Sequence, residues 1–426
     1  MKKLIVLILS LSVLTGNAQN TDSTDKLAAT YFKEAERAAY HQQIWKADVY
    51  GPTMFVDPQS RITYANEPDS AGILKPQDDI FKGVLPKEVM IANTSIHWQG
   101  KDWSVILWPL PHGRDERVNL VLHECFHRIQ TKLGFPERSP TVNHLSSLYG
   151  RVYFLLELNA LKAALGKPVS QRRADLANAL LFRKKRQELF AATFANERIL
   201  EMSEGLAEYT GMILGRQKDN IRQHLYHQID TAGNRRSLIR SSAYITGAVY
   251  GYLLYEKHPR WTLEIDSNSD LPVLLAKYYH LNLPKRGWSG GLEGLGKKYN
   301  ADAVLRSKKL KEDMRLQVVN QYLDIFIRRP VLTINLMKMN IVFNPNTVFD
   351  LGDHGTVYPT SEINDVWGKL TVTTGGMLMK NWQIVTLPAG GISINGQAIE
   401  GKGWTITLNP GWKILKTDEL HYRLTQ

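Results

Sequence analysis

Three patterns of hydrophobic and polar residues follow one another along the chain. In residues 19–110, a helical pattern over residues 24–44 gives way to short β-prone runs separated by glycine, proline and aspartate. Residues 111–329 carry apolar side chains mostly at three- and four-residue spacing, which predicts helices. Residues 330–426 alternate between apolar and polar positions and contain turn pairs such as Asn395-Gly396. The chain is therefore predicted to be an α+β protein, with a β-rich N-terminal subdomain behind a leading helix, a helical domain and a small all-β C-terminal domain.

The first eighteen residues have a pattern of their own. Lys2 and Lys3 precede an apolar run over residues 4–14, and Gly16-Asn17-Ala18 places small residues where a signal peptidase cleaves. This predicts a secretory signal peptide, residues 1–18, and a periplasmic or secreted protein. The run is too short to cross a bilayer, and no later stretch reaches eighteen apolar residues, so we expect no integral membrane span. The residue directly after the predicted cleavage site is Gln19 and not a cysteine, so we do not expect a lipoprotein.

One pentapeptide in the helical region carries candidate chemistry. His123-Glu124-Cys125-Phe126-His127 has the pattern H-E-x-x-H. Positions i and i+4 share a helix face, so His123 and His127 can direct ring nitrogens at one ion while Glu124 holds a water beside it. Apolar residues at helical spacing leave both histidines on an adjoining face. The pattern predicts one Zn²⁺ per chain, and the competing interpretation is a core helix with two hydrogen-bonded histidines.

A catalytic zinc needs a third protein ligand. A second helical segment places Glu197, Glu201, Glu204 and Glu208 along one stripe, where like charges repel unless a cation or basic side chains face them. Glu157 lies in a segment that is apolar almost all round, so its buried carboxylate needs a partner, either the metal or an arginine such as Arg151 or Arg183. From the residues alone the third ligand stays open among Glu204, Glu157, Glu208 and His144.

Together the two segments resemble the gluzincin branch of the zincin metallopeptidases, which carry H-E-x-x-H on one helix and a glutamate ligand on the next. The segment from Glu204 to Tyr209, E-G-L-A-E-Y, is similar to the E-G-F-A-x-Y segment of aminopeptidases in that branch. The resemblance covers about residues 117–211, although 76 residues separate His127 from Glu204. It implies a zincin-like fold, zinc held by His123, His127 and Glu204, and Glu208 behind a histidine ligand. A metzincin site is excluded, because Gln130 and Leu133 stand where that pattern needs glycine and histidine.

Two further features could complete such a site. Gly247 and Gly251 lie four residues apart in a segment rich in small residues and would let that helix approach a neighbour closely. Tyr244 or Tyr250 would then reach the metal as an oxyanion donor, unless both tyrosines simply pack between helices. A hairpin is also predicted just before the motif helix. The resemblance implies that its strand over residues 103–108 edges the cleft and pairs with extended substrate, and the alternative is a purely structural hairpin.

Charge and cysteine usage narrow the function classes. Lysine and arginine number 53 against 41 acidic residues, for a net charge of +12, but the basic residues are dispersed and no nucleic-acid recognition motif is present. The single cysteine, Cys125, falls on the apolar stripe and is interpreted as a core residue rather than a nucleophile. The sequence predicts an exported zinc hydrolase acting on peptide or protein substrates, with Glu124 as general base. The alternative is an inactive zincin-like binding protein of the envelope; no pattern indicates the oligomeric state.

Overall fold

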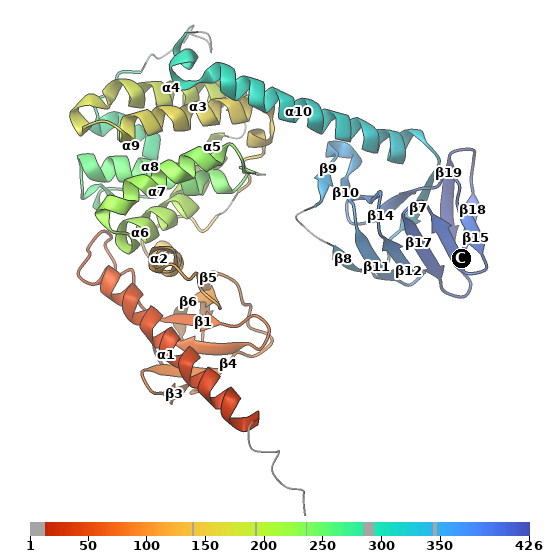
Figure 1. The fold of residues 1–426 in the computed structure, drawn as a ribbon, viewed down its shortest axis with the longest axis horizontal. Coiled ribbons are helices and arrows are strands. Elements are labelled where there is room, and N and C mark those ends of the chain that lie inside the picture. The colour runs from red at the N-terminus through yellow and green to blue at the C-terminus, as the bar shows by residue number, and fades with distance from the viewer. Residues whose placement is uncertain (1–12, 139, 192–193, 236, 284–293, 344–346) are drawn as a thin grey trace, which may run out of the picture. The chain divides into compact units, whose positions relative to one another are not determined.

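The computed structural model describes residues 13–138, 140–191, 194–235, 237–283, 294–343 and 347–426. Contacts divide the chain into two compact units, Met1–Lys308 and Lys309–Gln426, which are described separately (Figure 1). The described residues form helices and three sheets, with a helical core and a C-terminal β region, so the predicted α+β class is confirmed. Residues 1–12 of the predicted signal peptide lie outside the described residues. No helix in the described ranges has the length and apolarity needed to cross a bilayer.

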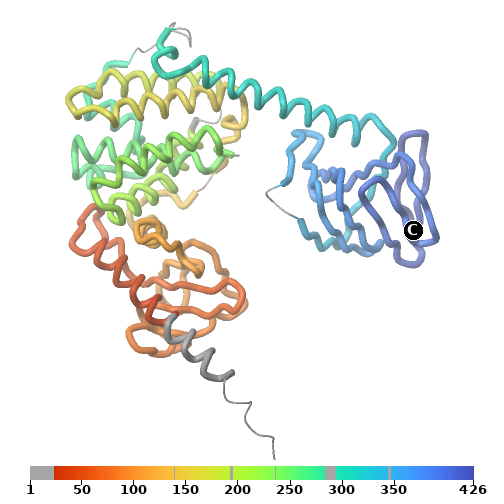
Figure 2. Tube along the Cα trace, viewed as in Figure 1, coloured from red at the N-terminus to blue at the C-terminus, as the bar shows by residue number. Residues whose placement is uncertain are grey.

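The first unit begins with a helix and a six-stranded sheet. The chain trace passes from α1 (Val13–Ala39) through the sheet to the motif helix (Figure 2). The predicted leading helix extended to residue 44, but α1 ends at Ala39 because His41 adopts a left-handed backbone conformation, with φ at 58°. The strands are β1 (Thr53–Val56), β2 (Ile62–Ala65), β3 (Lys75–Gln77), β4 (Ile80–Val84), β5 (Thr94–Trp98) and β6 (Lys101–Leu107).

The order of these strands is β3-β4-β2-β1-β6-β5, which makes β5 an edge. β5 and β6 form the predicted hairpin, and Gln99 and Gly100 at its turn both have positive φ, as a two-residue turn of this kind requires. β6 pairs in parallel with β1 on its other side. The strand expected to edge the cleft, residues 103–108, is therefore interior, and this expectation is corrected: β5 takes the edge.

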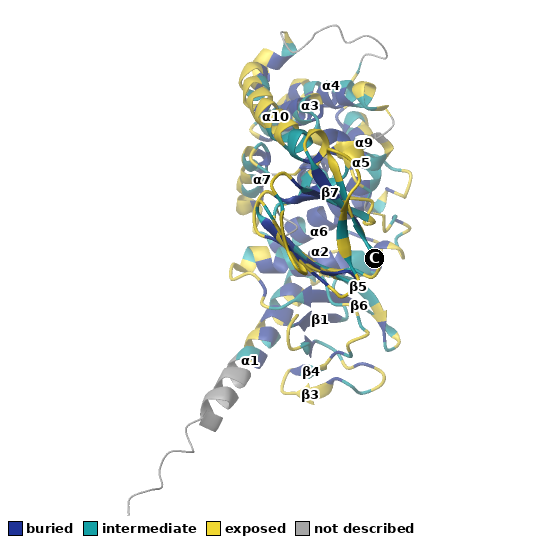
Figure 3. Ribbon diagram, turned by 90° about the vertical axis from the view of Figure 1, so that its right-hand side faces the viewer, coloured by how far each residue is buried: buried dark blue, intermediate teal, exposed yellow. Residues whose placement is uncertain are grey.

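Helices make up the rest of the first unit. They are α2 (Arg114–Gln130), α3 (Leu148–Leu165), α4 (Arg173–Leu189), α5 (Phe194–Leu200), a π-helical turn (Glu201–Gly205), α6 (Leu206–Gly215), α7 (Lys218–Ala232), α8 (Ser241–Lys257) and α9 (Leu271–Tyr278). α2 packs against α6 and the sheet, α6 and the π-turn pack against α8, and α3 packs against α4. Buried residues dominate α2 and α6 (Figure 3). The helix carrying the motif is thus fixed on several sides before any ligand binds.

The second unit is a β-sandwich preceded by a helix. One sheet has the order β18-β19-β7-β14-β13-β10-β9 and the other β15-β16-β17-β12-β11-β8, and both contribute to one hydrophobic core. The strands are β7 (Val331–Asn335), β8 (Asn340–Phe343), β9 (Phe349–Asp350), β10 (Thr356–Tyr358), β11 (Ser361–Asp365), β12 (Gly368–Val372), β13 (Met377–Lys380), β14 (Ile384–Pro388), β15 (Ser393–Asn395), β16 (Ala398–Gly401), β17 (Trp404–Leu408), β18 (Lys413–Lys416) and β19 (His421–Thr425).

Helix α10 (Ala301–Leu323) runs across the division between the units. The sequence placed a boundary at residue 330, just before β7, whereas the division of contacts falls at Lys308. The reason is a small apolar cluster in which Val319 and Tyr322 of α10 pack with Leu351 and Val357. The second half of the helix therefore belongs to the β unit.

Candidate metal centre

The apolar stripe of α2 fixes the rotation of the motif helix. Val118, Val121, Leu122, Cys125, Phe126 and Ile129 are all buried in the main core of the first unit. Cys125 is fully buried, its Sγ lies 3.5 Å from Thr53 Oγ1, and burial raises the pKa of its thiol, so it is a core residue as predicted. Because this face of α2 packs in the core, His123 and His127 lie on another side of the helix, which borders a cavity.

Three ligand atoms meet at the positions named by the motif resemblance. The Nε2 atoms of His123 and His127 are 3.2 Å apart, and Glu204 Oε2 lies 3.7 Å from the first and 3.6 Å from the second. Tetrahedral zinc with bonds of about 2.0–2.1 Å places its ligand atoms about 3.3 Å from one another. Two imidazoles and one carboxylate at these separations fit the donor set and geometry of a zinc site.

The second nitrogen of each imidazole is also held. His127 Nδ1 lies 2.6 Å from Gln130 Oε1, and His123 Nδ1 lies 3.4 Å from Glu208 Oε2. Glu208 is held in turn by Asn119, whose Nδ2 donates to its Oε1 at 3.2 Å. Such partners fix the ring orientation and leave Nε2 facing the centre, as in established zinc sites. Glu208 occupies the place that the resemblance implied for it.

A close approach of two glycines brings α8 to the π-turn that carries Glu204. A Cβ atom on Gly247 would lie 2.2 Å from the Cα of Gly205, so only glycine fits at this crossing. One turn earlier on α8, the Tyr244 hydroxyl donates to Glu204 Oε2 at 2.5 Å, and its ring stacks on His123 with centroids 5.4 Å apart. The small residues thus place Tyr244 at the site.

Opposing charges set the ionisation of the cluster. Burial alone would lower the pKa of His123, but the carboxylates of Glu204 and Glu208 outweigh it and raise that pKa to about 10. Burial alone would raise the pKa of Glu204, but the nearby imidazoles of His123 and His127 and the hydrogen bond from Tyr244 hold that pKa well below its usual range. The centre therefore pairs a carboxylate with an imidazolium whose proton a divalent cation can replace.

Glu124 differs from the neighbouring Glu204, the candidate ligand. Burial raises the pKa of Glu124, although the two neighbouring histidines act in the opposite direction. A carboxylate with a raised pKa accepts a proton more readily, which suits a general base working near neutral pH. Glu124 lines the same cavity as the three candidate ligands.

The cavity measures about 340 Å³ and opens between α2, α8 and the sheet edge. Besides the candidate ligands and Glu124, its lining residues are Asn93, Thr94, Ser95, Glu137, Ser203, Arg240 and Tyr244. Arg240 lies at the mouth, with its side chain 62% exposed and Nη2 3.8 Å from Glu204 Oε1.

The sequence patterns did not single out some residues that the structure places at or beside the site: Gln130, Asn119 and the residues at the start of β5. Only Gln130 could have been predicted to contact a histidine ligand candidate, because it follows His127 by three residues on one helix face.

Two residues of the predicted site lie elsewhere, and both predictions are corrected. Glu157 is fully buried between Arg183 and Arg186, which is the ion-pair interpretation rather than a place at the metal. The fully buried Tyr250 donates its hydroxyl to Glu157 and cannot face the cavity. His144, a further ligand candidate, bonds through Nε2 to Glu197 Oε1 at 2.6 Å. All three belong to one buried cluster behind the π-turn.

Fold and site together define an α+β protein with a His-His-Glu donor set, in which His123 and Glu204 are buried and His127 is half-buried, and with an adjacent buried glutamate, Glu124. Comparison with protein-family models, curated proteins and solved structures finds no match. Arguments about function therefore start from the site geometry and from the resemblance of its two motifs.

Proposed function

We propose that this protein is an exported, zinc-dependent peptidase of the gluzincin type. The observation that carries the proposal is the triangle formed by His123 Nε2, His127 Nε2 and Glu204 Oε2, with sides of 3.2, 3.7 and 3.6 Å. A zincin-like architecture, with the ligands on two helices and a β-strand beside the cleft, belongs to the same proposal. Export rests on the signal-peptide pattern of residues 1–18.

The chemistry proposed is hydrolysis of a peptide bond. Zinc, when bound, would lower the pKa of a water and polarise the scissile carbonyl. Glu124 accepts a proton from the attacking water and delivers it to the amide nitrogen as the carbon–nitrogen bond breaks, which leaves a carboxylic acid and an amine. The Tyr244 hydroxyl, whose one proton is donated to Glu204 in this structure, would turn from Glu204 to donate that proton to the oxyanion that forms on the carbonyl.

The sheet edge favours an extended peptide as the substrate. Thr94 and Ser95 of β5 line the cavity, and β5 pairs with β6 alone among the described strands. A peptide lying along the open side of β5 would gain main-chain hydrogen bonds and pass beside Glu124. β5 therefore replaces residues 103–108 as the strand proposed to pair with an extended substrate.

The mature protein, residues 19–426, is expected to cleave members of a quenched fluorescent peptide library when supplied with one equivalent of zinc. A zinc chelator should abolish cleavage, and added zinc should restore it, because the hydrolytic water needs the ion. Cleavage that survives complete removal of zinc would contradict the proposal. A zinc-loaded protein that cleaves no library member would instead support the binding-protein alternative.

A further inference from the structure

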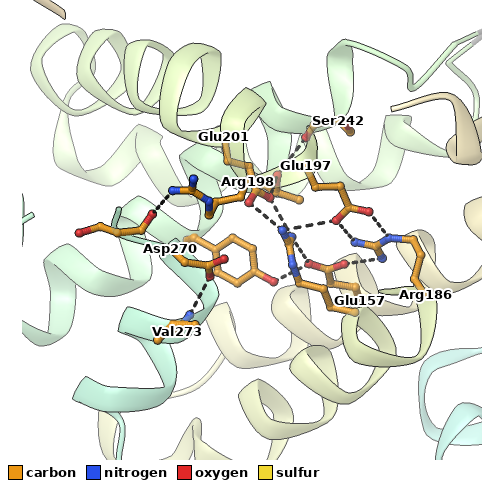
Figure 4. Close-up of polar contacts among 12 residues, drawn as sticks. Glu157, Arg186, Glu197, Arg198, Glu201, Ser242, Asp270 and Val273 are labelled. Carbon is orange, nitrogen blue, oxygen red and sulfur yellow. Dashed lines mark hydrogen bonds and ion pairs between the residues drawn. The ribbon is translucent and has the colours of Figure 1, made fainter. Parts of the chain in front are cut away.

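A group of buried ionisable side chains lies behind the candidate metal centre and takes no part in the chemistry proposed above. Three carboxylates face two guanidinium groups, and each of these five side chains is at most 6% exposed (Figure 4). The residues are Glu157 on α3, Arg183 and Arg186 on α4, Glu197 on α5 and Glu201 on the π-turn. We refer to these five residues as the buried charge cluster.

The arginines bind the carboxylates in paired, fork-like contacts. Arg183 donates from Nη1 and Nη2 to the two oxygens of Glu201, both at 2.8 Å. Arg186 donates from Nε and Nη2 to the two oxygens of Glu197, at 2.9 and 2.8 Å. Glu157 bridges the two arginines, at 3.3 Å from Arg183 Nη1 and 2.6 Å from Arg186 Nη1. Bidentate contacts of this kind fix orientation as well as distance.

Neutral side chains tie the cluster to other elements. Thr246 of α8 donates from Oγ1 to Glu201 Oε1 at 2.6 Å, and Tyr250 of the same helix donates to Glu157. His144 bonds to Glu197 from the segment before α3. The π-turn is thereby connected through Glu201 to α4, which precedes it in the sequence, and to α8, which follows it.

The π-turn separates two glutamates that an α-helix would keep together. Residues three apart in an α-helix lie on nearly one face, whereas the wider π-turn rotates them apart. Glu201 consequently faces Arg183, while Glu204 faces His123 and His127. Of the four glutamates in the stripe, the two that precede Ser203 contact arginines and the two that follow it contact histidines.

Stability alone does not account for so many buried ions. Removing charges from water is costly, and apolar side chains of equal volume often stabilise a core as well or better. What charged pairs add is a fixed geometry, because each fork contact has one favourable arrangement. The geometry fixed here is that of the turn that presents Glu204.

We propose that the buried charge cluster is a positioning device for the metal centre: by clamping Glu201 it holds the π-turn so that Glu204 meets both histidines at ligand distance. This inference rests on the proposed function, since it assigns a purpose to the position of a zinc ligand. Glu201 acts through Glu204 and is a positioning residue, because it does not line the cavity.

The test compares Glu201→Gln with Asp175→Asn. The amide of glutamine turns an N–H toward Arg183 and breaks the bidentate contact. Zinc affinity is therefore expected to fall about tenfold or more, the effect typical of losing a side chain that positions a zinc ligand. The visible spectrum of the cobalt-substituted protein should change as well, because the ligand geometry shifts. Asp175 on α4 is a matched control: its carboxylate is fully buried and held by Lys298 and Tyr299, both at 2.6 Å, but it does not touch the π-turn.

Asp175→Asn is expected to lower the thermal midpoint of the metal-free protein while leaving zinc affinity and the cobalt spectrum unchanged. If Glu201→Gln behaves in the same way, the cluster serves stability only and the inference is overturned. If Glu201→Gln does not fold, Thr246→Val replaces it in the test. Thr246→Val removes one hydrogen bond to Glu201 with almost no change in side-chain shape, and its zinc affinity and cobalt spectrum are measured in the same way. A wild-type protein that binds no zinc would overturn the proposed function itself, which is a separate result.

Discussion

Glu124→Gln is expected to abolish peptide hydrolysis while zinc stays bound. Glutamine keeps the size of the side chain but cannot accept the proton of the attacking water, and loss of a general base typically lowers the rate by about 10²–10⁴-fold. The three candidate ligands are untouched, so zinc content should remain that of the wild type. The measurement is kcat/KM on the best library peptide, with metal content determined on the same preparation.

The matched control for this variant is Glu116→Gln. Glu116 lies in the first turn of the same helix, α2, its side chain is 56% exposed, and it pairs with Arg216 at 3.3 Å. An ion pair as exposed as this one contributes little to the free energy of unfolding, so both the stability and the turnover of Glu116→Gln should be close to those of the wild type. Hydrolysis by Glu124→Gln at more than a tenth of the wild-type rate would exclude Glu124 as the base.

Gly247→Val should impair both folding stability and zinc binding. The added Cβ would lie 2.2, 2.6 and 2.7 Å from the Cα, C and O atoms of Gly205, and these backbone atoms cannot rotate away. Overpacking of this severity is expected to cost about 3 kcal/mol of the free energy of unfolding. Because α8 would be pushed off the π-turn, Glu204 would move from the histidines and zinc affinity should fall by more than tenfold. Denaturant unfolding of the metal-free protein and zinc titration measure the two effects.

Gly233→Ala serves as the control for that substitution. Gly233 also has a helical backbone conformation, but the nearest atom to a Cβ placed there is Lys308 Nζ, at an ordinary 3.6 Å. The free energy of unfolding should change by no more than about 0.5 kcal/mol, and zinc affinity should be unaffected. Wild-type zinc affinity in Gly247→Val would show that the glycine crossing does not set the position of Glu204.

The local part of the candidate site could be predicted from the sequence. The apolar stripe of α2 and the spacing of His123 and His127 determine which side of one helix bears the histidines, and both are properties of adjacent turns. The same holds for Gly247, whose role as a close-approach residue follows from its place in a helix of small side chains. Helical periodicity in the middle of the chain and alternation over residues 330–426 likewise sufficed for the α+β class.

The long-range part could not be predicted. The four glutamates of the stripe have the same local pattern, and only the tertiary positions of Arg183 and Arg186 decide which of them are paired away from the metal. For the same reason the sequence left Glu157 and Tyr250 open between the metal site and the core, because a helix buried all round gives no indication of which neighbour each side chain meets. The sheet edge was misassigned because the parallel pairing of β1 with β6 joins strands that are far apart in sequence.

The metal content of the purified mature protein, measured by mass spectrometry, tests the central claim most directly. The geometry of His123, His127 and Glu204 predicts about one zinc per chain in the wild type and its loss in both His123→Ala and Glu204→Ala. Absence of zinc even after reconstitution, or full zinc occupancy in the two variants, would contradict the account.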